Sequence, residues 1–104
     1  MRIITVCGSF KFKDEMMKVA EQLELTGNVA LIPIFPLNNN INAFTEKELT
    51  MLGKMHKEKI KLSDAILVVN VNSYIGNSTK SEIEFAESLN KEIVYYTDLI
   101  SNIK

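Results

Sequence analysis

Glu82 is the acidic residue best placed to do chemistry. It follows a glycine-containing loop that comes after an apolar run at residues 65–71. The run is expected to form a buried strand, and the segment from about Ser78 to Asn90 a helix with Glu82 in its first turn. A carboxylate near a helix N-terminus is favoured in its ionised form, which suits a nucleophile more than a general acid. The sequence Thr79-x-x-Glu82 is also a capping box, so a purely structural role for Glu82 stays open.

His56 and Cys7 are the other residues whose side chains could take part in a reaction, and each is the single residue of its type. His56 lies four residues after Leu52 and seven after Leu49, on the apolar face of a helix expected to begin at the capping box 45–48. It should point inward or along a cleft, either as a packed core residue or as a proton donor. Cys7 ends an apolar run and is expected to be inert core. One histidine and one cysteine predict no histidine-rich or multi-cysteine metal site, and we expect neither metal nor cofactor.

Gly8-Ser9 separates the first apolar run from the first helical pattern. Backbone N–H groups and the Ser9 hydroxyl could bind an anion there, or Ser9 could simply cap the helix. Neither Gly-x-Gly-x-x-Gly nor a Walker A sequence is present, which argues against dinucleotide and P-loop sites. Tyr74, in the loop before Glu82, could stack on a base or anchor the loop.

The apolar patterns alternate between strand and helix along the whole chain. Such alternation requires right-handed crossovers, and hence a parallel sheet with helices on both faces. We expect an α/β, three-layer, Rossmann- or flavodoxin-like open sheet of four strands in the order 2-1-3-4. The expected strands are residues 2–7, 29–34, 65–71 and 92–96, and the expected helices are 11–26, 45–62 and 78–90, with a final short turn or helix at 98–102.

A ligand crevice is expected where the strand order reverses, between the loops that follow the first and third strands. Residues from both loops and from the start of the following helices should line it. The expected binding residues are Gly8, Ser9, Phe10, Asn70, Tyr74, Gly76, Asn77 and Ser78, beside Glu82.

Composition limits the classes of partner. The 104 residues fit one domain, 1–104, and 12 Lys+Arg stand against 13 Asp+Glu. That balance lacks the positive field that nucleic-acid polymers require, and favours a small, near-neutral ligand. The longest apolar run is too short to cross a membrane, and Met1 leads directly into a strand pattern. We therefore expect a soluble, cytoplasmic protein.

In these residues the chain resembles the nucleoside 2-deoxyribosyltransferase-like family, which includes the 2′-deoxynucleoside 5′-monophosphate N-glycosidases. The likeness covers nearly the whole chain, through residues 7–9, 63–65, 76–86 and 91–96. In that family a glutamate after the third strand attacks the sugar C1′ and the base leaves; Glu82 matches it. The family's Gly-Ser turn lines the same pocket and helps to hold a 5′-phosphate, and Gly8 and Ser9 match that turn.

The chain departs from the family pattern at two positions. The family has an aspartate eight residues before the aspartate of its Ala-Asp strand start, and the corresponding residue here is His56, counted back from Asp64. The family also has a tyrosine near the end of its first strand, where this chain has Thr5. His56 could replace the aspartate as an assisting acid or as a residue that orients the sugar.

Two functions follow. The first is an N-glycosidase or deoxyribosyltransferase acting on a nucleoside or nucleotide, with Glu82 as nucleophile and His56 assisting. The alternative is a non-catalytic module that binds a nucleotide or nucleoside derivative. A homodimer is expected, because a small open sheet leaves edges and helix faces to cover and because the resembling family forms oligomers.

Overall fold

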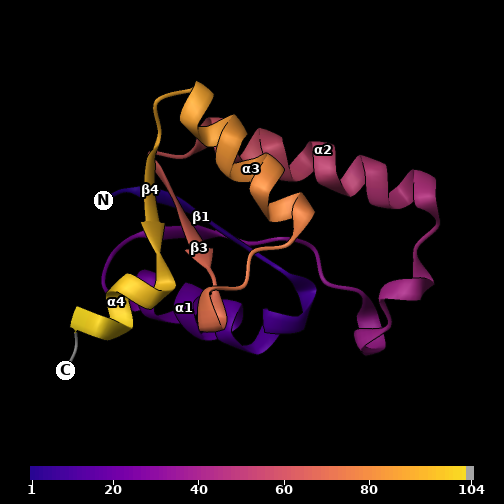
Figure 1. The fold of residues 1–104 in the computed structure, drawn as a ribbon, viewed down its shortest axis with the longest axis horizontal. Coiled ribbons are helices and arrows are strands. Elements are labelled where there is room, and N and C mark those ends of the chain that lie inside the picture. The colour runs from indigo at the N-terminus through magenta and orange to yellow at the C-terminus, as the bar shows by residue number, and fades with distance from the viewer. Residues whose placement is uncertain (103–104) are drawn as a thin grey trace.

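The computed structural model describes residues 1–102 of the chain. It shows a four-stranded parallel sheet in the order β2-β1-β3-β4, as the sequence predicts (Figure 1). Cys7 pairs with Val68 across the two central strands. The strands are β1 (Ile3–Gly8), β2 (Val29–Leu31), β3 (Ala65–Val69) and β4 (Glu92–Tyr95).

Helices cover both faces of this sheet, which confirms the three-layer α/β architecture. Helices α2 and α3 lie on one face, and α1 and α4 lie on the other (Figure 1). Short 3-10 turns occupy residues 10–12, 37–39, 41–43 and 71–73. The helices are α1 (Lys13–Leu25), α2 (Glu46–Leu62), α3 (Asn77–Ser88) and α4 (Tyr96–Asn102). None of these helices is long and apolar enough to span a membrane.

Strand β1 divides its side chains between the two faces of the sheet. Ile4 and Val6 pack in the cluster that includes Met16 of α1. Cys7 packs with Ile60 of α2 and with a residue of α3 on the opposite face. A strand covered on both faces needs no polar alternation, which explains the continuous apolar pattern of β1 and β3.

Helix α2 begins as the sequence predicts. Thr45 accepts a hydrogen bond from the Glu48 backbone N–H, and the Glu48 carboxylate accepts one from the Thr45 N–H at 2.8 Å. This reciprocal pair satisfies two backbone donors that the helix leaves free. The expected apolar face is only partly buried, because Leu49, Met55 and Leu62 are exposed. The N-terminal half of α2 extends beyond the sheet (Figure 1).

Helix α3 begins earlier than the sequence suggests. Gly76 is its N-cap and Asn77 its first residue, so Thr79 lies inside the helix, where it is buried. The expected capping box at Thr79 and Glu82 is therefore wrong. Glu82 is the sixth residue of the helix and lies in its second turn, where the free N–H groups of the first turn no longer favour a negative charge.

Two strands are shorter than predicted. β2 ends at Leu31, before the expected Ile34, because Pro33 and Pro36 cannot donate ladder hydrogen bonds. β3 ends at Val69, and residues 71–73 form a 3-10 turn instead of extending the strand.

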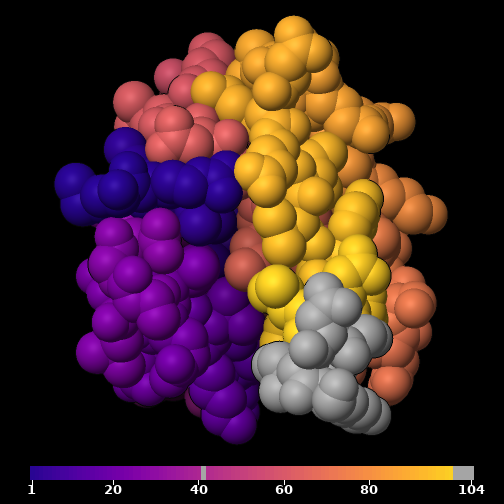
Figure 2. Space-filling view, turned by 90° about the vertical axis from the view of Figure 1, so that its left-hand side faces the viewer, coloured from indigo at the N-terminus to yellow at the C-terminus, as the bar shows by residue number. Residues whose placement is uncertain are grey.

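The amino-terminal edge of the sheet is held by polar contacts. The Arg2 guanidinium pairs with Glu92 of β4. The Asp64 carboxylate accepts a hydrogen bond from the Ile3 N–H at 2.8 Å, which fixes the start of β3 against β1. Figure 2 shows the start of β1, in indigo, beside the yellow segment of β4 and α4.

Candidate functional site

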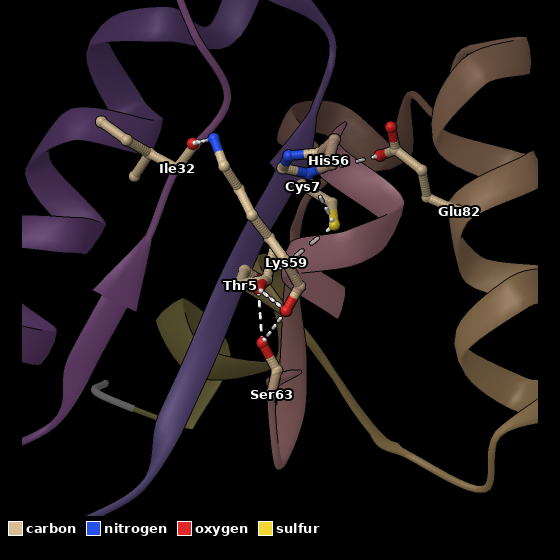
Figure 3. A network of polar contacts seen from close by, with 7 residues as sticks. All are labelled: Thr5, Cys7, Ile32, His56, Lys59, Ser63 and Glu82. Carbon is tan, nitrogen blue, oxygen red and sulfur yellow. Dashed lines mark hydrogen bonds and ion pairs between the residues drawn. The ribbon is translucent and has the colours of Figure 1, made fainter. Parts of the chain in front are cut away.

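Cys7, His56 and Glu82 meet at the carboxyl end of β1. Each comes from a different element: β1, α2 and α3. His56 Nε2 lies 3.5 Å from Cys7 Sγ and 3.9 Å from Glu82 Oε1. Figure 3 shows the three side chains pointing toward one another. The structure thus brings Glu82 and His56 together and adds Cys7.

A polar network below these residues fixes α2 against β1. The Lys59 carbonyl accepts hydrogen bonds from the hydroxyls of Thr5 at 3.1 Å and Ser63 at 2.8 Å. Lys59 Nζ donates to the carbonyl of Ile32 at 2.7 Å, which ties α2 to the segment after β2 (Figure 3). Because His56 lies one helical turn before Lys59, this network also sets the position of the imidazole.

Burial governs the ionisation of Glu82. It raises the pKa of Glu82 to about 7, against smaller opposing effects of a hydrogen bond from the Cys7 thiol and of the Lys57 charge. Removing a carboxylate from water disfavours its charged form. The expectation that a helix N-terminus favours the ionised form of Glu82 is therefore wrong, since Glu82 lies in the second turn of α3 and its side chain is only 15% exposed.

Burial acts on His56 in the opposite direction. It lowers the pKa of His56 to about 4, the Lys59 charge lowers it further, and the backbone of Val6 acts the other way. Among the described residues, His56 Nδ1 is buried without a hydrogen bond of normal geometry. The imidazole is neutral at pH 7, so the 3.9 Å contact with Glu82 is not an ion pair there.

Cys7 has the environment of a structural thiol. The side chain is fully buried, and burial, followed by the charge of Glu82, raises its pKa well above the usual value. A protonated and inaccessible thiol is a poor nucleophile, which agrees with the expectation from sequence.

A pocket of about 190 Å³ opens beside His56 and Glu82. Its walls are mostly apolar, and they come from the end of β1, the segment after β2, helix α2 and the start of α3. Phe10 and Phe35 lie close together here, with ring centroids 6.2 Å apart. The lining residues are Gly8, Phe10, Met16, Pro33, Ile34, Phe35, Phe44, Leu49, Leu52, Gly53, Met55, His56, Lys59, Ser78 and Glu82.

Three of the eight expected binding residues line this pocket with Glu82: Gly8, Phe10 and Ser78. Gly8 has a steric reason to be glycine. A Cβ atom at this position would come within 3.1 Å of both the Val69 carbonyl oxygen and Met16 Sδ. The bare backbone of Gly8 therefore allows β1 to end directly against the core.

The structure places the other five expected binding residues away from the pocket wall. Asn70 is turned toward α4, where it donates to Thr97 Oγ1 at 3.2 Å and accepts from the Thr97 N–H at 3.1 Å. The Tyr74 ring packs against Phe12 and lies 3.5 Å from Lys11 Nζ. These two residues hold loops in place. The remaining three are Ser9, which caps the 3-10 turn at residues 10–12, and Gly76 and Asn77, which begin α3.

The wall formed by the segment between β2 and α2 was missed by the sequence reasoning. Phe35 and Phe44 belong to this segment, and Lys59 faces the same space from α2. The signal was the order of strands: β2 neighbours β1, so the segment leaving β2 also emerges at the carboxyl edge.

No protein-family model matches the chain, and neither does any curated protein sequence. A solved structure described as a 2-desoxiribosyltransferase from Leishmania mexicana is similar, with a TM-score of 0.67 at 18% sequence identity. The similarity covers 92% of this chain and 64% of that one, so this chain spans less than two thirds of its length. Together with the strand order, this similarity shows that the chain has a nucleoside 2-deoxyribosyltransferase-like fold.

Proposed function

We propose that the chain cleaves the N-glycosidic bond of a nucleoside or nucleotide, with Glu82 as the nucleophile. One observation carries the proposal: the Glu82 carboxyl group lies on the wall of the pocket at the carboxyl edge of a deoxyribosyltransferase-like sheet. Ligands of open α/β sheets bind at this edge, where the strand order reverses.

The reaction would proceed in two steps. An ionised Glu82 oxygen attacks C1′ of the sugar and forms an ester bond, while the bond from C1′ to the base nitrogen breaks. The base leaves with that electron pair and takes a proton from water. A water molecule, or the nitrogen of a second base, then attacks C1′ and releases the Glu82 carboxylate.

His56 is proposed to position Glu82. A pKa of about 4 leaves the imidazole neutral at pH 7, so it is poorly suited to protonating the departing base. Its Nε2 lies 3.9 Å from Glu82 Oε1 and limits the orientations that the carboxyl group can take. Of the two roles expected from the sequence, assisting acid or orienting residue, the second is the one we propose.

The pocket walls support a ligand with an aromatic base. Phe10 and Phe35 offer ring surfaces on one side, and Ser78, Lys59 and Glu82 supply polar groups. A cavity of about 190 Å³ is smaller than those that hold drug-sized molecules, so it would enclose one part of a nucleoside, such as its base.

The test is base release from a panel of deoxynucleosides and their monophosphates, measured by chromatography with a metal chelator present. Glu82→Gln should reduce the rate by roughly 10³-fold or more, because loss of a covalent nucleophile removes the main route of reaction. Glu84→Gln, an exposed glutamate on the same helix, is the matched control and should leave the rate unchanged. No base release from any substrate, or undiminished release by the Glu82 variant, would reject the proposal.

A binding module is the second candidate, and the pKa of Glu82 supports it. The raised pKa of Glu82, about 7, means that part of the population carries a protonated Glu82 at neutral pH, and this form cannot attack C1′. This candidate predicts that a nucleotide stabilises the fold by about 2.7 kcal/mol at one hundred times its dissociation constant, with no product formed. The absence of a thermal shift across a nucleotide panel would count against it.

A homodimer remains part of the proposal. Leu49, Met51 and Met55 are exposed on α2, and Leu49 and Met55 also border the pocket. A second copy that covers these side chains would close the pocket mouth. Light scattering should report twice the monomer mass, and a monomer at all concentrations would exclude this assembly.

A further inference from the structure

We propose that Cys7, His56 and Glu82 form a binding site for a single zinc ion, in competition with the glycosidase chemistry of Glu82. The ligand atoms are Cys7 Sγ, His56 Nε2 and a carboxylate oxygen of Glu82, and all three lie within 4.8 Å of one another. No sequence motif indicates this site, because it uses one residue of each type instead of a repeated cysteine or histidine motif.

The distances fit tetrahedral zinc. With Zn–S near 2.3 Å and Zn–N near 2.0–2.1 Å, sulfur and nitrogen ligands of one ion lie about 3.5 Å apart. The Cys7 Sγ to His56 Nε2 distance is 3.5 Å. The Glu82 oxygen lies 3.9 Å from the same nitrogen and within 4.8 Å of Cys7 Sγ, so it must move toward both atoms, by about half an ångström toward the nitrogen, to complete the tetrahedral set.

The chemistry of the three ligands selects zinc over the hard cations. Thiolate and imidazole are ligands that Mg²⁺ and Ca²⁺ avoid, whereas zinc prefers them. A thiolate, a carboxylate and a neutral imidazole also balance the two positive charges of the ion. A buried site that is neutral overall avoids the large cost of placing net charge away from water.

The protein holds the three ligands on regular elements. Cys7 and His56 are buried, and the Lys59 carbonyl network fixes the helix that carries His56. His56 Nδ1 points away from the site, so Nε2 is left to face the ion (Figure 3). Glu82 and His56 also line the pocket, which gives the ion a route in and leaves its fourth position open to water.

Zinc and a sugar cannot use Glu82 at the same time. An ion bound to the Glu82 carboxylate withdraws electron density from it and makes it a weaker nucleophile toward C1′, so zinc would inhibit base release. The zinc site does not depend on that activity, however, because it rests on the three ligand positions alone.

The test uses the full-length protein without a histidine tag, reduced and stripped of metal, and titrated with Co²⁺ as a spectroscopic substitute for Zn²⁺. We expect one equivalent to bind with visible bands of tetrahedral cobalt and a near-ultraviolet thiolate-to-cobalt charge-transfer band. Added Zn²⁺ should displace the cobalt and abolish both. No charge-transfer band with the wild-type protein would overturn the proposal, whether or not the protein releases base.

Two variants and a control separate the ligands. Cys7→Ser should lose the charge-transfer band. Glu82→Gln should keep the band but bind Zn²⁺ more weakly. Loss of an outer-shell partner lowers metal affinity by roughly 10- to 100-fold, and loss of the Glu82 ligand should lower it by at least that much. Glu84→Gln should bind like the wild type. A charge-transfer band that survives in Cys7→Ser, or unchanged zinc affinity in Glu82→Gln, would overturn the site. If Cys7→Ser fails to fold, the Glu82 variant decides.

Discussion

The two faces of the sheet are built from the same strands but differ in chemistry. Toward α1 and α4, the buried side chains are mostly apolar, such as Val6, Met16 and Leu67, and the buried amide of Asn70 is hydrogen-bonded to α4. Toward α2 and α3, buried apolar residues are interrupted by Thr5, His56 and other polar groups. Alternate residues of β1 therefore belong to two different environments.

This difference shows on which face of the sheet polar groups are buried at a cost in free energy. Burying a hydroxyl, an imidazole or a carboxyl group is unfavourable unless each finds a partner. On the α2 and α3 face Thr5 and Ser63 are satisfied by a backbone carbonyl, whereas His56 and Glu82 respond by shifting their pKa values away from the charged forms. His56 and Glu82, whose pKa values are shifted in this way, both line the pocket, as expected for a functional site.

The largest effect on stability is expected on the apolar face. Met16→Ala removes a fully buried side chain from the cluster beneath α1 and should lower the free energy of unfolding by about 2–5 kcal/mol. Urea titration followed by circular dichroism measures this loss. A loss below about 1 kcal/mol would mean that the neighbouring side chains relax to fill the space left by Met16, so that this face is not rigidly packed.

On the polar face, the stability of metal-free protein should depend on pH through two opposing groups. Glu82 has a raised pKa in the fold, so its contribution is complete below pH 4.5 and is lost as the pH rises through about 7. His56 has a lowered pKa, so its contribution is present above pH 6.5 and is lost as the pH falls through about 4. In the wild type the two trends offset each other between pH 4 and 7.

Replacing one of the two residues should reveal the pH dependence of stability that the other one contributes. Glu82→Gln should leave a protein that loses up to about 3 kcal/mol of stability between pH 7 and 4, and His56→Gln one that gains a similar amount over the same range. Urea unfolding at several pH values, with chelator present, measures both slopes. Slopes of equal sign in the two variants would contradict the opposite pKa shifts.

A smaller effect is expected from the hydroxyl network. Thr5→Val keeps the shape of the side chain but removes the hydrogen bond to the Lys59 carbonyl, which also accepts from Ser63. The loss should be about 1 kcal/mol, since a neutral hydrogen bond contributes roughly that amount. Thermal unfolding of Thr5→Val beside the conservative Thr5→Ser isolates the hydroxyl, and equal stability of Thr5→Val and wild type would show that the network adds nothing.

The sequence was sufficient for the fold because periodicity and topology rules act together. Apolar runs and helical spacing located the four strands and the three longest helices of the described residues, and the crossover rule then gave the parallel order 2-1-3-4. The start of α2 was also predictable, because Thr45 and Glu48 satisfy each other locally. Local signals of this kind do not need the rest of the molecule.

The sequence failed where tertiary packing overrides a local motif. Thr79 and Glu82 have the spacing of a capping box, but Thr79 is buried inside α3 and Gly76 caps the helix. That shift moved Glu82 from the first turn to the second, and burial reversed the expected direction of its pKa shift. The meeting of Cys7 with His56 was equally hidden, because it depends on how α2 packs against β1.

The segment between β2 and α2 divides the pocket into parts that can evolve at different rates. Phe35 and Phe44 lie on this irregular segment, while Cys7, His56 and Glu82 lie on a strand and two helices. Insertions and substitutions are tolerated more readily in such connections than in the elements they join. Insertions and substitutions in residues 32–44 could therefore change which ligand a relative of this chain binds, while the reactive group keeps its position on the strand and the two helices.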